Sequence, residues 1–166
     1  MPSVPIDAYD RRILEALQAD GRLTNLELAE RVGLSPSPCL RRVRALEAEG
    51  LIKGYGARLD RKKIGLGMTV FVAVNIELHK EVEAAKFRDA LLAFPEVVSC
   101  YITSGDFDFL LQVVTPDLDA YREFSLERLI KVPGVKGIHS SFVIDTVKDG
   151  APFPLTHLSV TRPAAR

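Results

Sequence analysis

The stretch TNLELAERVGLSPSPCLRRVRALEAEG, residues 24–50, decides the fold of the first third of the chain. Thr24, followed three residues later by Glu27, has the spacing of a capping box, which starts a helix. Gly33 then supplies the left-handed conformation of a tight turn. Ser35, followed by a proline, is typical of the start of a second helix. Its expected buried stripe is Leu40, Val43 and Leu46. The stretch therefore predicts a helix-turn-helix motif.

The second of these helices lies in the most basic part of the chain. The whole chain has 22 basic and 22 acidic residues and a formal net charge of +0, so its total charge does not argue for nucleic acid. Between Ser35 and Lys63, however, eight basic residues stand against three acidic ones, a local charge of +5. Such asymmetry is typical of a surface that binds nucleic acid.

Arginine donates paired hydrogen bonds to guanine edges or to phosphate, and a helix N-terminus attracts phosphate. We therefore expect DNA contacts from the outward face of this helix and from a small hairpin, or wing, in residues 51–60. The candidate residues are Ser35, Ser37, Arg41, Arg42, Arg44, Lys53 and Arg58. The alternative is a solvated arginine face paired with Glu47 and Glu49, which the turn pattern and the wing make less attractive.

The periodicity changes after residue 67. Apolar residues alternate from Met68 to Leu78, as in a half-buried strand. Further strands are expected at 97–103, 109–114 and 135–147, with helices at 81–94 and 116–131. The order β-α-β-β-α-β predicts a ferredoxin-like sheet. The expected α+β chain has a winged helix-turn-helix domain (1–59), a linker (60–67), a ferredoxin-like domain (68–158) and a tail (159–166).

A four-stranded sheet with both helices on one face leaves its other face bare. Thr69, Phe71 and Ala73 would lie on that face of the first strand. An exposed Phe71 is hard to explain in a monomer, because large apolar patches usually mark interfaces. We therefore expect oligomerisation through this domain.

Several segments resemble the Lrp/AsnC family of bacterial and archaeal regulators: IDAYDRRILEALQADGR, the stretch quoted above, SGDFDFLLQV and IKVPGV. The resemblance covers about Ile6 to Lys148. It implies an N-terminal DNA-binding domain and a C-terminal effector and oligomerisation domain. It also implies dimers that pair through the C-terminal sheets and assemble further, typically into octamers, with an amino acid held between dimers as the effector.

The family's effector region maps onto the turn Ser104–Asp108 and onto the last strand. Asp106 or Asp108 could bind the ammonium of an amino acid, and N–H groups of a glycine turn could bind its carboxylate. The residues implied are Ser104, Gly105, Asp106, Asp108, Leu118, Ser140 and Phe142. The alternative is an ordinary hairpin turn at Gly105 that Asp108 caps, with Leu118 and Phe142 in packing or interfaces.

Other functional classes find little support. Cys39 and Cys100 suggest neither a disulfide framework nor a metal site; Cys39 reads as a packed or DNA-facing thiol and Cys100 as core. The histidines are scattered and no phosphate-binding loop is present, so no cofactor and no enzyme activity are expected. Without a signal peptide or a spanning apolar run, we expect a soluble cytoplasmic protein with no membrane partner.

The function expected from the sequence is a sequence-specific transcriptional regulator whose assembly and DNA affinity respond to an amino acid. The alternative is an architectural DNA-binding protein without a small-molecule response.

Overall fold

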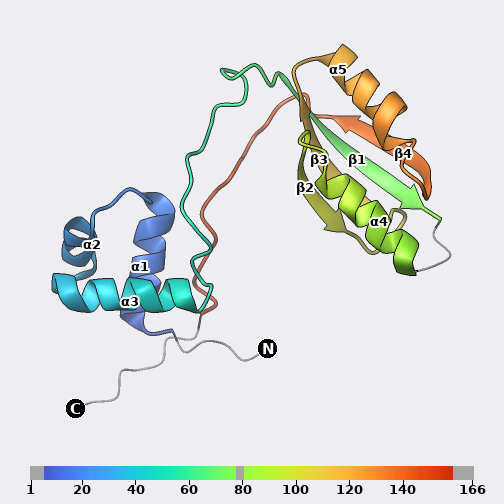
Figure 1. Cartoon of the computed structure of the whole chain (residues 1–166). Helices are drawn as coiled ribbons and strands as arrows, with labels where there is room; N and C mark the ends of the chain where they lie inside the picture. The colour runs from blue at the N-terminus through green and yellow to red at the C-terminus, as the bar shows by residue number, and fades with distance from the viewer. Residues whose placement is uncertain (1–5, 78–80, 159–166) are drawn as a thin grey trace. The chain divides into compact units, whose positions relative to one another are not determined.

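The computed structural model describes residues 6–77 and 81–158, except for the side chains of residues 81–86, and the chain divides into two compact units (Figure 1). The helical unit comprises the described residues up to Arg58 and from Lys148 onward, and the sheet unit comprises Leu59–Val147. The sequence analysis placed residues 148–158 in the ferredoxin-like domain. The structure groups them with the helices because Leu155 and Leu158 pack against the helical core.

The helical unit contains α1 (Ala8–Ala19), α2 (Asn25–Val32) and α3 (Pro36–Ala48). The predicted capping box of α2 is confirmed: the Glu27 N–H donates to Thr24 Oγ1 (3.3 Å), and the Thr24 N–H donates to Glu27 Oε2 (2.7 Å). Gly33 ends α2 with φ +75°, the left-handed conformation expected of the turn. The core is formed by Ile6, Ile13, Leu14, Ala16, Leu28, Ala29, Val32, Cys39 and Leu46.

The buried face of α3 differs from the prediction. Cys39 is fully buried, whereas Leu40 is 38% exposed. Cys39, Val43 and Leu46 are spaced four and three residues apart, which keeps them on one helical face; Leu40 is one position off that face. The thiol therefore belongs to the core, and burial raises its pKa.

The expected wing hairpin is absent from the described structure: residues 51–60 form no strand. The Leu51 and Ile52 N–H groups instead donate to the Leu46 carbonyl and close the end of α3. Farther on, the Arg58 side chain bonds to main-chain carbonyls of residues 149 and 150. The segment is held by these contacts instead of by cross-strand pairing.

The sheet unit has the predicted ferredoxin-like order. Its strands are β1 (Met68–Ile76), β2 (Val97–Ile102), β3 (Phe109–Thr115) and β4 (Val135–Phe142). They are antiparallel in the order β2-β3-β1-β4. β4 ends at Phe142, five residues before the expected end at Val147.

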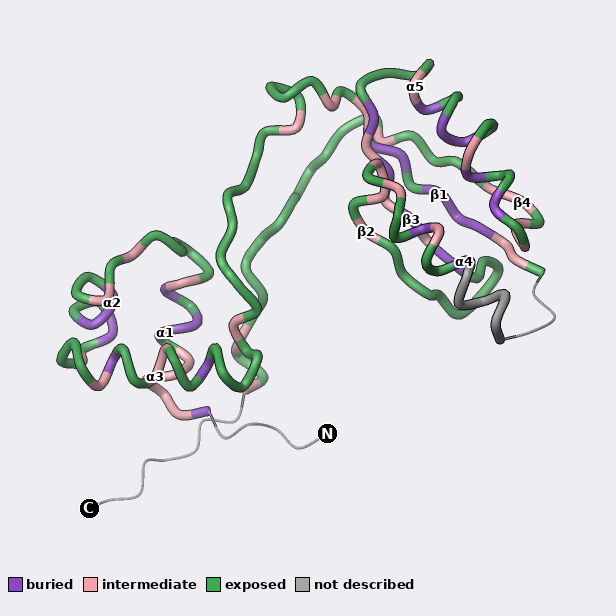
Figure 2. Tube along the Cα trace, viewed as in Figure 1, coloured by how far each residue is buried: buried purple, intermediate pink, exposed green. Residues whose placement is uncertain are grey.

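One face of the sheet carries the core of this unit, seen as the buried stretches of β1, β3 and the last helix in Figure 2. Phe87 and Leu91 of α4 (Glu81–Leu92) and Tyr121 of α5 (Leu118–Glu123) pack there. α5 continues into η1, a π-helical turn (Phe124–Leu129), in which the Ile130 N–H donates to the Ser125 carbonyl, five residues back.

The other face of the sheet has no helix on it. Thr69 and Ala73 are buried there among their neighbours, whereas Phe71 stays 37% exposed. Cys100 is exposed and not core, because β2 is an edge strand that pairs only with β3. Across the described residues, no helix is long and apolar enough to cross a membrane.

Candidate functional site

The outward face of α3 carries polar and basic side chains at its start and middle. Ser37, Arg41 and Arg44 are exposed. Arg41 and Arg44 form no ion pair with any of the residues described. Ser35 occupies the N-cap position, but its side chain makes no capping hydrogen bond. These groups are therefore available to a ligand that approaches the start of α3.

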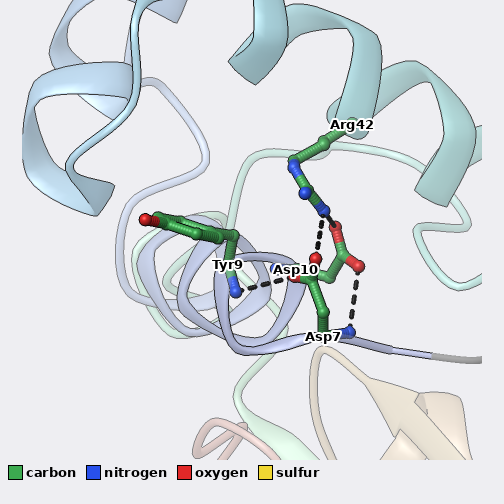
Figure 3. Close-up of polar contacts among 4 residues, drawn as sticks. All are labelled: Asp7, Tyr9, Asp10 and Arg42. Carbon is green, nitrogen blue, oxygen red and sulfur yellow. Dashed lines mark hydrogen bonds and ion pairs between the residues drawn. The ribbon is translucent and has the colours of Figure 1, made fainter. Parts of the chain in front are cut away.

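Arg42 does not share this face. Its Nη1 lies 2.8 Å from Asp7 Oδ2 and 2.8 Å from Asp10 Oδ1, at the start of α1 (Figure 3). Its guanidinium carbon also lies 5.5 Å from the centre of the Tyr9 ring. The predicted outward position of Arg42 is therefore wrong: the acidic N-terminus of α1 draws the side chain inward.

The acidic partners of Arg42 also cap α1. Asp7 Oδ1 accepts from the N–H groups of Tyr9 (2.8 Å) and Asp10 (3.0 Å), and the Asp7 N–H donates to Asp10 Oδ2 (3.1 Å). Burial raises the pKa of Asp7, but the Asp10 N–H and the Arg42 guanidinium outweigh it, so that pKa lies below its usual value. The Asp7–Asp10 spacing is itself a capping-box signal that could have revealed this cluster.

The two basic residues expected on the wing have different surroundings. Lys53 is exposed. Arg58 donates from Nη2 to the Asp149 carbonyl (3.0 Å) and from Nη1 to the Gly150 carbonyl (2.9 Å). The Arg58 guanidinium thus binds main-chain carbonyls of the same chain.

The turn between β2 and β3 carries four of the expected effector residues. Ser104, Gly105, Asp106 and Asp108 are all exposed. Asp108 Oδ2 accepts from the Ile76 N–H (2.8 Å), and its own N–H donates to the Val74 carbonyl (3.1 Å). Asp108 therefore fixes the turn against β1. The Asp106 carboxylate has no hydrogen bond or ion pair to the described residues.

The other expected effector residues lie near α5. The Ser140 hydroxyl shares a short hydrogen bond with Tyr121, and the rings of Tyr121 and Phe142 meet edge to face, with centroids 5.3 Å apart. Leu118 is 58% exposed at the start of α5. Tyr121, only 4% exposed, links the first two residues and was not singled out by the sequence. Burial raises its pKa, although the Ser140 bond acts in the opposite sense.

The turn and Phe142 lie at different levels of the sheet. Val74 of β1 pairs with Phe109, next to the turn, whereas Val70 pairs with Phe142. Four residues of strand separate these levels, about 13 Å along the sheet. Ser140 pairs with Val72, about 7 Å from the level of Val74, so Phe142 lies farther from the turn than Ser140 does.

No group of three or more metal-ligating side chains occurs in the part of the chain that the structure describes.

Comparison with known proteins defines the class of protein to which this chain belongs. Residues 6–53 match a winged helix-turn-helix DNA-binding domain, and residues 69–153 match the Lrp/AsnC ligand binding domain. A helix-turn-helix joined to a ligand-binding domain is the organisation of a transcriptional regulator.

The chain belongs to the Lrp/AsnC family. It is 42% identical over 147 residues to the leucine-responsive regulatory protein of Escherichia coli K12, covering 89% of this chain and 90% of that protein. Among solved structures it is similar to a Neisseria meningitidis transcriptional regulator in complex with L-Met (TM-score 0.89, 41% identity, 93% of this chain and 99% of that one). It is also similar to an AsnC family regulator of Agrobacterium tumefaciens (TM-score 0.85, 39% identity, 90% and 97%).

Proposed function

We propose that this regulator is a homo-oligomer that binds specific DNA sequences with helix α3. We also propose that an amino acid changes its assembly and its DNA affinity. The observation that carries the DNA proposal is the outward, unpaired position of Arg41 and Arg44 on the second helix of the motif. Ser35 and Ser37 lie at the N-terminus of the same helix, where phosphate is favoured. Lys53 adds a flanking charge.

Alanine substitution of each arginine tests this placement. If the replaced residue contacts a base, the variant should lose about 1–3 kcal/mol of its discrimination between the correct and a wrong base pair at that position. A residue that contacts phosphate should weaken binding to all sequences and reduce the salt slope by about one. If Arg41→Ala and Arg44→Ala both bind DNA as the wild type does, α3 is not the reading helix.

The oligomer is proposed to form through the open face of the sheet, around Phe71. A dimer with one helix-turn-helix per copy would present two recognition helices to successive major grooves, about 34 Å apart. Further assembly toward an octamer follows the family resemblance. The protein would act in the cytoplasm by binding, not by catalysis.

For the effector, we propose that Asp106 receives the ammonium group and that N–H groups of the turn at Gly105 receive the carboxylate. Asp108 instead shapes the turn through its bond to Ile76. Because Phe142 stands apart from the turn in one copy, we propose that the site is completed between copies. The Neisseria relative, solved with L-Met, makes an amino acid the first class of ligand to test.

Thermal unfolding against each of the twenty amino acids, with oligomer mass followed in parallel, tests the effector proposal. A ligand at a hundredfold excess over its Kd stabilises the bound state by about 2.7 kcal/mol. Asp106→Ala should abolish the shift and keep DNA binding. If no amino acid changes the unfolding temperature or the oligomer mass, the result favours the alternative, an architectural DNA-binding protein without an effector.

A further inference from the structure

The segment 149–158 is held along its length by the helical unit. Near its start, Arg58 bonds to the carbonyls of Asp149 and Gly150. In its middle, the Gln18 side chain pairs with both main-chain groups of Phe153: the Phe153 N–H donates to Oε1 (2.7 Å), and Nε2 donates to the carbonyl (3.3 Å). All four bonds join a side chain of the helical unit to the main chain of the segment.

The end of the segment adds apolar contacts. Leu155 and Leu158 are partly buried against the helical core. They line a groove of about 540 Å³ whose other apolar walls come from α1 and the chain after α3. These wall residues are Leu14, Leu17, Leu51, Ile52 and Tyr55. The apolar side chains of the segment thus supply burial, while its main chain supplies the polar pairing.

Gly150 permits the close approach of Arg58. Its φ is +53°, and a Cβ at this position would lie 2.4 Å from Arg58 Nη2. Any other residue would meet both a strained backbone and the guanidinium. The geometry around Arg58 is therefore specific to this segment of the chain.

We propose that residues 149–158 of the same chain dock on the helical unit and form one wall of this groove, and that Arg58 clamps together the two connections to the sheet unit. The chain leaves the helical unit after Arg58 and returns to it at Lys148. Arg58 therefore binds the outgoing segment to the returning one, next to both boundaries of the unit. The unit that carries α3 is thus connected to the sheet unit by two segments of the chain that Arg58 holds together, where the sequence analysis expected a single linker at residues 60–67.

The docked segment belongs to the same chain because the contacts begin one residue after the return at Lys148. Further contacts follow along the segment at Phe153, Leu155 and Leu158. A segment from a second copy is the competing occupant, and its docking would depend on protein concentration. This inference does not depend on DNA or effector binding.

Hydrogen exchange on the full-length protein tests the docking. Leu155→Asp places a charge in the groove and should speed exchange in residues 149–158 and 51–55 by at least about tenfold. Thr156→Asp is the matched control: it adds the same charge at the neighbouring, exposed position and should leave both regions unchanged.

Gln18→Ala is the milder variant, because Gln18 is exposed on a helix that tolerates alanine. It should speed exchange of the Phe153 amide by about tenfold, with little change in the core of α1 and α2. Three results would overturn the proposal: Phe153 exchange unaffected by Gln18→Ala, equal effects of Leu155→Asp and Thr156→Asp, or wild-type protection of the segment that disappears on dilution.

Discussion

Replacing Arg42 with alanine removes the cation that Asp7 and Asp10 share at the start of α1. Both contacts are 2.8 Å long, and the side chains are 30%, 18% and 15% exposed for Arg42, Asp7 and Asp10. An exposed ion pair contributes up to about 1 kcal/mol, whereas breaking a buried one costs about 3–5 kcal/mol. For this half-buried pair we expect a loss of about 2 kcal/mol, which lowers the melting temperature of the helical unit by roughly 10 °C.

Arg41→Ala is the matched control, since Arg41 is the same residue type one position earlier and is exposed without an ion pair. It should leave stability within about 0.5 kcal/mol of the wild type. If the proposed DNA contact of Arg41 is to a phosphate, Arg41→Ala should reduce the salt slope of DNA binding by about 0.9. Arg42→Ala should show the reverse: lower stability with the salt slope retained.

The pH dependence gives a second measurement on the same variant. The pKa of Asp7 lies below its ordinary 3.8 in the folded protein. Its contribution is therefore fully present above about pH 4 and is lost as pH falls through the lowered pKa. Denaturant unfolding should show the gap between wild type and Arg42→Ala narrowing below about pH 4. A gap that stays constant with pH, or an Arg42→Ala variant that is fully stable and has a reduced salt slope, would refute the assignment of Arg42 to the acidic cluster.

Three further variants test other elements. Gly33→Ala should cost about 1 kcal/mol, because the residue has φ +75°, and thermal unfolding measures it; an unchanged melting temperature would contradict the strain. Glu96→Gln should destabilise the sheet unit by up to about 1 kcal/mol by weakening its two bonds with Arg128. Burial raises the pKa of Glu96, but the contacts with Arg128 outweigh it and the pKa lies below its ordinary 4.5. The loss should therefore be fully present above about pH 4.5 and disappear as pH falls through the lowered pKa, measured by unfolding at several pH values. Phe71→Glu should lower the oligomer mass measured by light scattering at equal concentration, whereas Lys62→Glu should not; equal masses would contradict an interface on the open face.

Local signals in the sequence predicted the elements well. The Thr24–Glu27 capping box, the left-handed Gly33 and the first strand of the sheet depend on residues a few positions apart, and all three are confirmed, although burial along β1 does not alternate strictly. The order of strands and helices was sufficient to predict the ferredoxin-like sheet. Such features can be read from one sequence because their causes are short-range.

The errors arose where a distant residue decides the outcome. Arg42 meets Asp10, which lies 32 positions earlier in the chain, so its inward position could not follow from the periodicity of α3. The choice of Cys39 over Leu40 depends on how α3 rotates against α1 and α2. The segment around Phe153 pairs with Gln18 across 135 positions, and no local pattern marks it as part of the helical unit.

The candidate site divides in the same way. Arg41 and Arg44 were predicted to be outward from helical geometry alone, and they are exposed. The separation of the Asp106 turn from Phe142 became visible only with the register of β1, β3 and β4. Sequence could nominate these effector residues but could not measure the distance between them.

The π-helical turn η1 has a consequence for how this protein tolerates changes of length. In an α-helix, residues five apart point about 140° away from each other. The widened turn brings Phe124 and Leu129 to the same buried face. Removing one residue between them would return the helix to α-helical geometry with both ends still directed at the sheet, whereas adding one would rotate Leu129 away from it. Natural length variation in this region should therefore favour single deletions over single insertions.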